Sequence, residues 1–248
     1  MELDKLVNSL ATLDSIHNVV PFEPHKDRLV LFDFSMNNTE LSPEVINNTP
    51  AFIKYINHQL ETSGAKYGIG GYGEERSIYS RSGLFGSNEL NKENTSLESA
   101  NATLYEEPRR LHLGIDIWGK PHTKVMAPFD GFVHSFAFNN SFGDYGSTII
   151  LSHSIGTEPF YTLYGHLSLA SIKNLGEGEP IRRGDVFAEF GIPQENGYWP
   201  PHLHFQIIKD LQGMHGDYPG VCKASEKNYY LSNCPDPDLI LRMLRYVK

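Results

Sequence analysis

From about residue 104 onward, the chain consists of short runs of apolar and aromatic residues separated by glycines. Runs of this kind, bounded by glycine-rich turns, are typical of β-strands. We predict strands over residues 123–126, 131–138, 147–153, 160–165, 186–190 and 203–208. Turns are expected at the sequences PFDG, FGDYG, GEGEP and RRGD. Because no long helical pattern separates these strands, we predict a mainly β fold with an antiparallel sandwich or barrel-like domain.

The N-terminal residues 1–66 have a mixed pattern, which predicts a small α/β region. Apolar spacing predicts a short amphipathic helix over 1–13, and dense apolar and aromatic content predicts a strand over 28–35. A longer helix is expected over 43–62, with its N-cap at Ser42.

The segment 67–103 is rich in glycine, serine and asparagine and has little periodicity. We therefore predict an extended connection that is partly disordered around 86–102. Its aromatic and arginine content is high for a linker, and we expect four of its side chains to pack across the next domain: Arg76, Tyr79, Arg81 and Phe85. Residues 104–215 would then form the β-domain, and residues 216–248 a loop-rich tail with a short helix.

The composition of the 248 residues is that of an ordinary globular protein, with 40% hydrophobic and 21% charged residues. The net charge of −9 argues against binding to nucleic acid or to an anionic membrane, since both favour a basic surface. No apolar stretch has the length of a transmembrane helix, and the acidic start MELDKLVNSLATLDS does not resemble a secretory signal. If Met1 is the native start, we expect a cytoplasmic protein; a different native start leaves an extracytoplasmic location open. In a reducing compartment, Cys222 and Cys234 would be free thiols.

Three short stretches contain histidines that could meet in one site. In HLHF, His202 and His204 are two residues apart on a predicted strand, so both side chains leave it from the same face. In HLGID, a bent strand or loop around the central glycine could bring His112 and Asp116 together. In YGHL, His166 ends an aromatic strand.

Together these residues could satisfy a catalytic zinc site, which needs three protein ligands and one open position for water. His112, Asp116 and one histidine of the 202/204 pair would supply the ligands. The remaining imidazoles could take and return a proton, because histidine titrates near neutral pH. They would replace the glutamate base of an H-E-x-x-H motif, which the chain lacks.

The same stretches closely resemble the lysostaphin/LytM-type zinc metallopeptidases, whose pattern is H-x-x-x-D, then Y-x-H-L, then H-x-H. HLGID, YGHL and HLH match this pattern in order, and VMAPFDGFVHSF, GDYGSTIILSH and IRRGDVFAEFG resemble the family's strand–turn sequences. The resemblance implies a β-fold of the duplicated-hybrid-motif type. It also implies one zinc ion (Zn²⁺) held by His112, Asp116 and His204.

The resemblance further implies that His166 and His202 are catalytic. One would position or deprotonate water, and the other would stabilise the oxyanion and protonate the leaving amine; which does which stays open. Tyr164 and Trp199 would line the substrate cleft. The implied function is that of a hydrolase, a zinc metallopeptidase that cuts peptidoglycan-derived or other small peptides.

Two other functions remain alternatives. A member of this family could keep its metal without cleaving, as a binding module, and a histidine phosphocarrier has a similar β-architecture. The stretch 70–240 also resembles family members found joined to class III aminotransferases and small-molecule kinase-like domains. We further hypothesise that residues 67–100 lie across the cleft and restrain activity. No pattern in the sequence predicts an oligomeric state.

Overall fold

The computed structural model describes residues 4–86 and 107–247. The helices are α1 (Lys5–Thr12), α2 (Pro43–Ile46), α3 (Thr49–Ser63), α4 (Leu169–Ile172), α5 (Lys227–Asn233) and α6 (Asp238–Leu241). The 3-10 helices are η1 (Ser77–Arg81), η2 (Gly83–Phe85), η3 (Ala224–Glu226) and η4 (Leu244–Tyr246). Apart from residue 86, the stretch 86–102 that we expected to be partly disordered lies outside the described residues, as does the predicted domain start at 104.

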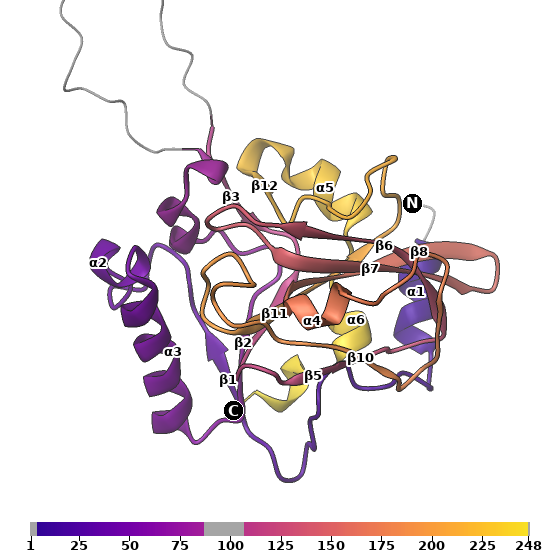
Figure 1. The fold of residues 1–248 in the computed structure, drawn as a ribbon, viewed down its shortest axis with the longest axis horizontal. Helices are drawn as coiled ribbons and strands as arrows, with labels where there is room; N and C mark the ends of the chain where they lie inside the picture. The colour runs from indigo at the N-terminus through magenta and orange to yellow at the C-terminus, as the bar shows by residue number, and fades with distance from the viewer. Residues whose placement is uncertain (1–3, 87–106, 248) are drawn as a thin grey trace, which may run out of the picture.

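The strands are β1 (Leu29–Phe32), β2 (Tyr67–Gly70), β3 (Arg109–His112), β4 (Ile115–Trp118), β5 (Lys124–Met126), β6 (Gly131–Asn139), β7 (Gly146–Ile155), β8 (Glu158–Leu167), β9 (Pro180–Ile181), β10 (Val186–Glu189), β11 (His202–Ile208) and β12 (Val221–Lys223). Eight of them form one sheet in the order β1-β2-β4-β11-β8-β7-β6-β9 (Figure 1). All pairings in this sheet are antiparallel except β1 with β2. The predicted strand-rich, antiparallel fold is therefore confirmed.

The N-terminal region joins this sheet at its β1–β2 edge. Strand β2 pairs with β4, so that Gly68 lies opposite Trp118 and Gly70 lies opposite Asp116. Helix α3 lies beside this edge in Figure 1, and its residue Phe52 places its ring 6.0 Å from that of Trp118. The predicted division at residue 66 thus falls within a continuous sheet.

The predicted helix over 43–62 is two helices, α2 and α3, because the helical conformation is interrupted at Asn47 and Asn48. The Asn48 side chain accepts a hydrogen bond from the Ala51 amide at 3.0 Å, which caps α3 and starts a new helix there. At the other end, Gly64 adopts a left-handed conformation with φ of 63° and terminates α3.

Hydrophobic residues pack on both faces of the sheet. On β7, Ile149 and Ile150 belong to two different buried clusters, as the alternation of side chains along a strand requires. The cluster around Ile149 includes Leu6 and Leu10 of α1 and Ile240 of α6, whereas Ile150 packs with buried residues from β12 and the C-terminal tail. The sheet is therefore a central layer with both faces covered.

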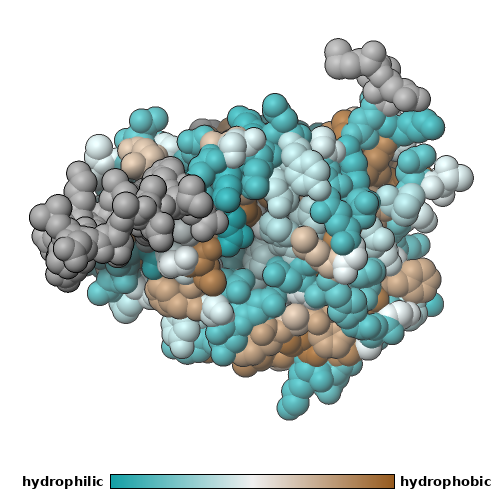
Figure 2. All heavy atoms as spheres, turned by 90° about the horizontal axis from the view of Figure 1, so that it is seen from above, coloured by the Kyte–Doolittle hydropathy of each residue, from teal (hydrophilic) through white to brown (hydrophobic). Residues whose placement is uncertain are grey.

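The face of the molecule shown in Figure 2 is largely polar. Hydrophilic residues cover most of the face seen in Figure 2, and apolar residues form smaller patches among them. Among the described residues, none of the helices combines the length and the hydropathy that crossing a membrane would require.

Candidate metal centre and catalytic cleft

Three strands bring the predicted ligands together. Asp116 of β4 lies directly opposite His204 of β11 in the antiparallel register, and His112 ends β3 just before the bend that leads into β4. Gly114 forms this bend, and a Cβ built on it would lie 2.5 Å from Cε1 of His204. The close approach of the two segments therefore requires glycine at this position.

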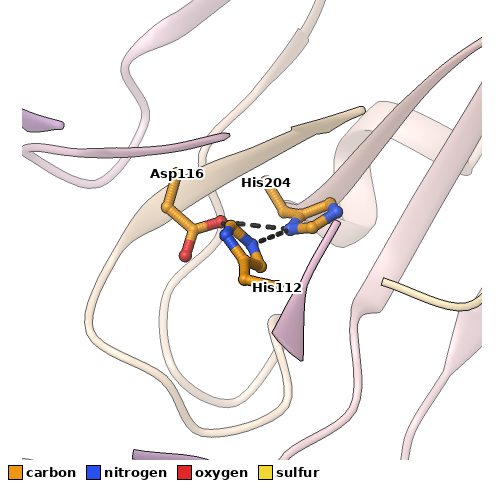
Figure 3. Close-up of side chains that lie close together, drawn as sticks. All are labelled: His112, Asp116 and His204. Atoms are coloured by element: carbon orange, nitrogen blue, oxygen red, sulfur yellow. Dashed lines mark hydrogen bonds and ion pairs between the residues drawn. The ribbon is translucent and has the colours of Figure 1, made fainter. Parts of the chain in front are cut away.

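The three donor atoms face one another, as Figure 3 shows. His112 Nε2 lies 2.9 Å from His204 Nδ1 and 3.2 Å from Asp116 Oδ1, and His204 Nδ1 lies 3.1 Å from Asp116 Oδ1. Zinc bonds of about 2.0–2.1 Å at tetrahedral angles would space their donors by about 3.3 Å. The three side chains thus form one face of a tetrahedral donor set, and all are buried.

The opposite nitrogen of each ring holds a proton and so determines the tautomer. His112 Nδ1 donates to the Gly71 carbonyl at 3.1 Å, and His204 Nε2 donates to Gln206 Oε1 at 2.9 Å. Gln206 presents its oxygen because its own amide nitrogen donates to Pro219 O. Each neutral imidazole then turns an unprotonated nitrogen inward. Two lone pairs 2.9 Å apart beside a carboxylate are stabilised by a cation between them, so the residues fit a divalent metal.

The electrostatics of the centre favour neutral histidine and ionised aspartate. Burial, and then the charge of Arg76, lowers the pKa of His112 to about 3. Burial alone would raise the pKa of Asp116, but its interactions with His112 and Arg76 hold that pKa well below its ordinary value. These are the protonation states that metal ligands need.

Two further histidines lie next to the three predicted ligands. The rings of His166 and His202 have centroids 4.0 Å apart, and His202 also stacks on Trp118 at 3.9 Å. His166 Nδ1 donates to Asn196 O at 2.9 Å, and His202 Nδ1 donates to Pro200 O at 2.8 Å. Both rings therefore keep Nε2 free to accept a proton.

Burial keeps these two rings neutral. It lowers the pKa of His202 to about 4 and, together with the neighbouring His202, holds the pKa of His166 well below its ordinary value. Both side chains line the same cleft as Asp116 and His204. The structure thus brings all five predicted ligand and catalytic residues to one place.

Part of the chain matches the sequence model of a known protein family. Residues 110–216, which contain all five of these side chains, match peptidase family M23. These residues are called the M23 domain below, after the family that they match. A comparison with curated proteins found no match.

Several solved structures are similar to part of the chain. A zinc-containing peptidase from Vibrio cholerae is 25% identical, with a TM-score of 0.32; the match covers 40% of this chain and 27% of that one. The catalytic domain of lysostaphin from Staphylococcus simulans is 22% identical, with a TM-score of 0.34 and coverage of 49% and 80%. A mutant catalytic domain of the prophage-encoded M23 protein EnpA from Enterococcus faecalis is 19% identical, with a TM-score of 0.34 and coverage of 51% and 89%.

Of the two predicted cleft residues in the M23 domain, Trp199 lines the cleft and Tyr164 does not. Tyr164 is fully buried in the hydrophobic core, and its ring packs against Phe187 and Phe205. The pairing of β8 with β7 shifts register beyond Tyr164, and His166 adopts a positive φ of 63°. This irregularity breaks the alternation, so Tyr164 and His166 point to different environments although they are two residues apart.

Sequence reasoning missed Tyr145 of the M23 domain. Its hydroxyl lies 3.4 Å from His204 Nε2, its ring centroid lies 5.5 Å from that of His166, and it lines the cleft. Gly165 leaves room for it, because a Cβ there would lie 2.4 Å from Cδ1 of Tyr145. Its sequence context, FGDYG, indicates only a turn.

One wall of the cleft comes from outside the M23 domain. Tyr79 of η1 and Phe85 of η2 line it, and the Tyr79 ring lies 6.1 Å from that of Trp199. Arg81 is buried, and its guanidinium lies over the Trp199 ring at 4.5 Å. Arg76 reaches Asp116 itself. The packing of these four side chains against the M23 domain agrees with the expectation from their composition.

Proposed function

We propose that the chain is a zinc-dependent metallopeptidase that hydrolyses a peptide bond. One observation carries this proposal: His112 Nε2, Asp116 Oδ1 and His204 Nδ1 lie within 2.9–3.2 Å of one another, with both imidazoles fixed in the tautomer that binds metal. The membership of residues 110–216 in peptidase family M23 supports the reaction class.

When bound, a zinc ion would supply a Lewis acid that activates water and polarises the carbonyl of the substrate. The protein's own contribution is the pair His166 and His202, which line the cleft and whose Nδ1 hydrogen bonds leave Nε2 without a proton. A neutral imidazole can take the proton of the attacking water, and a protonated one can stabilise the oxyanion and protonate the leaving amine. Both histidines suit either role.

The proposed substrate is a peptide, either a peptidoglycan-derived fragment or another small peptide. Aromatic side chains from two parts of the chain, Tyr79, Tyr145 and Trp199, line the cleft beside the histidines. Such walls bind a narrow, extended chain by stacking and apolar contact. The class of reaction rests on the donor set, whereas the substrate rests on the resemblance to lysostaphin-like enzymes.

Metal analysis of two histidine variants tests the roles. His112→Ala removes a ligand, so the purified variant is expected to lose stoichiometric zinc. His202→Ala is expected to keep zinc and to lose about 10²–10⁴-fold in turnover, the usual contribution of a general acid or base. The measurements are zinc content by elemental analysis and cleavage of a panel of glycyl and D-amino-acid peptides.

The outcomes separate the alternatives. Full zinc in His112→Ala would refute the ligand assignment. A wild-type protein that holds zinc but cleaves no peptide of the panel would favour the metal-retaining binding module. A wild-type protein that binds no zinc would favour the histidine phosphocarrier.

A further inference from the structure

The turn of residues 71–76, which precedes the M23 domain, makes three hydrogen bonds with His112, the first of the proposed ligands. The Gly71 carbonyl accepts the hydrogen bond from His112 Nδ1 at 3.1 Å. The amide of His112 donates to Glu74 O at 2.9 Å, and the His112 carbonyl accepts from Gly73 N at 2.9 Å. The orientation of the His112 ring therefore depends on a segment outside the matched family region.

The same turn holds the second ligand through Arg76. Arg76 Nη1 lies 2.5 Å from Asp116 Oδ2, and Arg76 Nε lies 2.7 Å from Glu74 Oε2. The Arg76 side chain has no solvent exposure, and its guanidinium lies over the Phe34 ring at 5.2 Å. Gly70 gives it space, because a Cβ there would lie 2.6 Å from Arg76 Nη2. The Arg76 guanidinium is planar, buried and held at both Nε and Nη1, so it has a single orientation.

The two oxygens of Asp116 are thus divided between two partners. Oδ2 faces Arg76, whereas Oδ1 faces the inward nitrogens of His112 and His204. A free carboxylate could turn and offer both oxygens to one cation. Here the guanidinium occupies one of them.

We propose that Arg76 is a positioning residue that makes Asp116 a ligand through Oδ1 alone and holds the donor set in place before the metal arrives. Restricting Asp116 to one oxygen leaves a coordination position for water, which a second carboxylate oxygen would otherwise take. Pairing with Arg76 also stabilises the buried Asp116 charge when no metal is present. The inference rests on the proposed function, because it assumes that these three residues bind zinc.

The decisive variant removes Arg76 without changing the charge of its surroundings. In Arg76→Met/Glu74→Gln, one positive and one negative charge disappear together, so the net charge around the donor set stays the same. We expect the full-length variant to bind Zn²⁺ about 10–100-fold more weakly in competition with a chromophoric chelator, the usual effect of losing an outer partner of a ligand. Its Co²⁺-loaded form is expected to lose visible absorption, because a second oxygen from Asp116 raises the coordination number.

Three single variants complete the test. Glu74→Gln keeps the contact between Arg76 and Asp116, and its Co²⁺ spectrum should match that of the wild type. Arg81→Met removes a buried guanidinium that stacks on Trp199, and its Co²⁺ spectrum should also be unchanged. Arg76→Lys keeps the charge but not the planar fork, and it should restore part of the lost absorption.

The results distinguish this inference from the proposed function. If the wild type binds neither Zn²⁺ nor Co²⁺, the proposed function fails; if the double variant binds both as the wild type does, only the role of Arg76 fails. If the double variant does not fold, a crystal structure of the zinc-loaded wild type tests the role of Arg76 by showing how Asp116 binds the metal. Asp116 binding through Oδ1, with Oδ2 still on Arg76, supports the inference, and binding through both oxygens overturns it.

Discussion

Gly114 shows how closely one position in the chain constrains the metal centre. It lies between two proposed ligands, His112 and Asp116, and faces the third. A Cβ at this position would lie 2.5 Å from Cε1 of His204 and 2.8 Å from the carbonyl oxygen of Phe205. The second contact is with backbone, which cannot move aside as a side chain can. Any larger residue at position 114 must therefore displace His204 or strand β11.

We predict that Gly114→Ala weakens zinc binding by at least about tenfold while the protein remains folded, because the methyl group pushes a ligand out of place. Zinc affinity and far-UV circular dichroism measure the two effects. Gly176→Ala is the matched control, since a Cβ there has its nearest contact at 3.7 Å, on a Glu179 side chain. Unchanged affinity in Gly114→Ala would contradict the close approach.

At the scale of elements, irregular strands and capped helices determine which side chains reach the site. The register shift between β7 and β8 directs His166 to the cleft and leaves Tyr164 in the core. On the other side of the site, α3 presents Phe52, whose ring lies 6.0 Å from Trp118 and 6.4 Å from Trp199. Trp118 in turn stacks on His202. Helix α3 therefore supports His202, one of the two proposed catalytic histidines, through one intervening ring.

The cap of α3 provides a test of what this helix contributes to stability. Replacing Asn48 by Ala removes the hydrogen bond to the Ala51 amide and should lower the free energy of unfolding by about 1 kcal/mol. Urea unfolding measures the change. Asn57→Ala, at an exposed position within the same helix, should change it by less than about 0.5 kcal/mol. Equal effects of the two substitutions would exclude a specific role for the cap.

At the scale of the whole molecule, the N-terminal region and the M23 domain share one sheet and one aromatic cluster. Strand β2 pairs with β4, and the cluster formed by Phe34, Phe52, Trp118 and Trp199 draws on both regions. Since the two regions bury these surfaces against each other, neither has a separate core at this edge of the sheet.

We therefore predict that the two regions unfold together. Trp118 and Trp199 are the two tryptophans of the chain and both are buried in the shared cluster, so their fluorescence reports its loss. Circular dichroism reports the loss of the sheet. In metal-free protein the two signals should change at the same urea concentration, and Asn48→Ala should shift both equally. A fluorescence change that precedes the dichroism change would indicate separate unfolding.

The sequence by itself determined the class of fold and the residues of the proposed site. Short apolar runs punctuated by glycine marked strands β5, β6, β7, β8, β10 and β11, because side-chain alternation and turn chemistry are local properties. The stretches HLGID, YGHL and HLHF indicated the five residues His112, Asp116, His166, His202 and His204, because a catalytic zinc site needs three ligands and a group that transfers protons. The division of the five into ligands and catalytic residues came from the family resemblance. Strand β2 was missed because its four residues lie in a glycine-rich stretch with little periodicity.

Only the tertiary structure decided what surrounds that site. Arg76 lies 40 positions from Asp116 in the sequence, and no local pattern relates the two residues. The exclusion of Tyr164 from the cleft depends on a register shift between β7 and β8, and the position of Tyr145 depends on the space at Gly165. Contacts of this kind arise when distant strands pair and pack, so their residues become neighbours only in the folded chain.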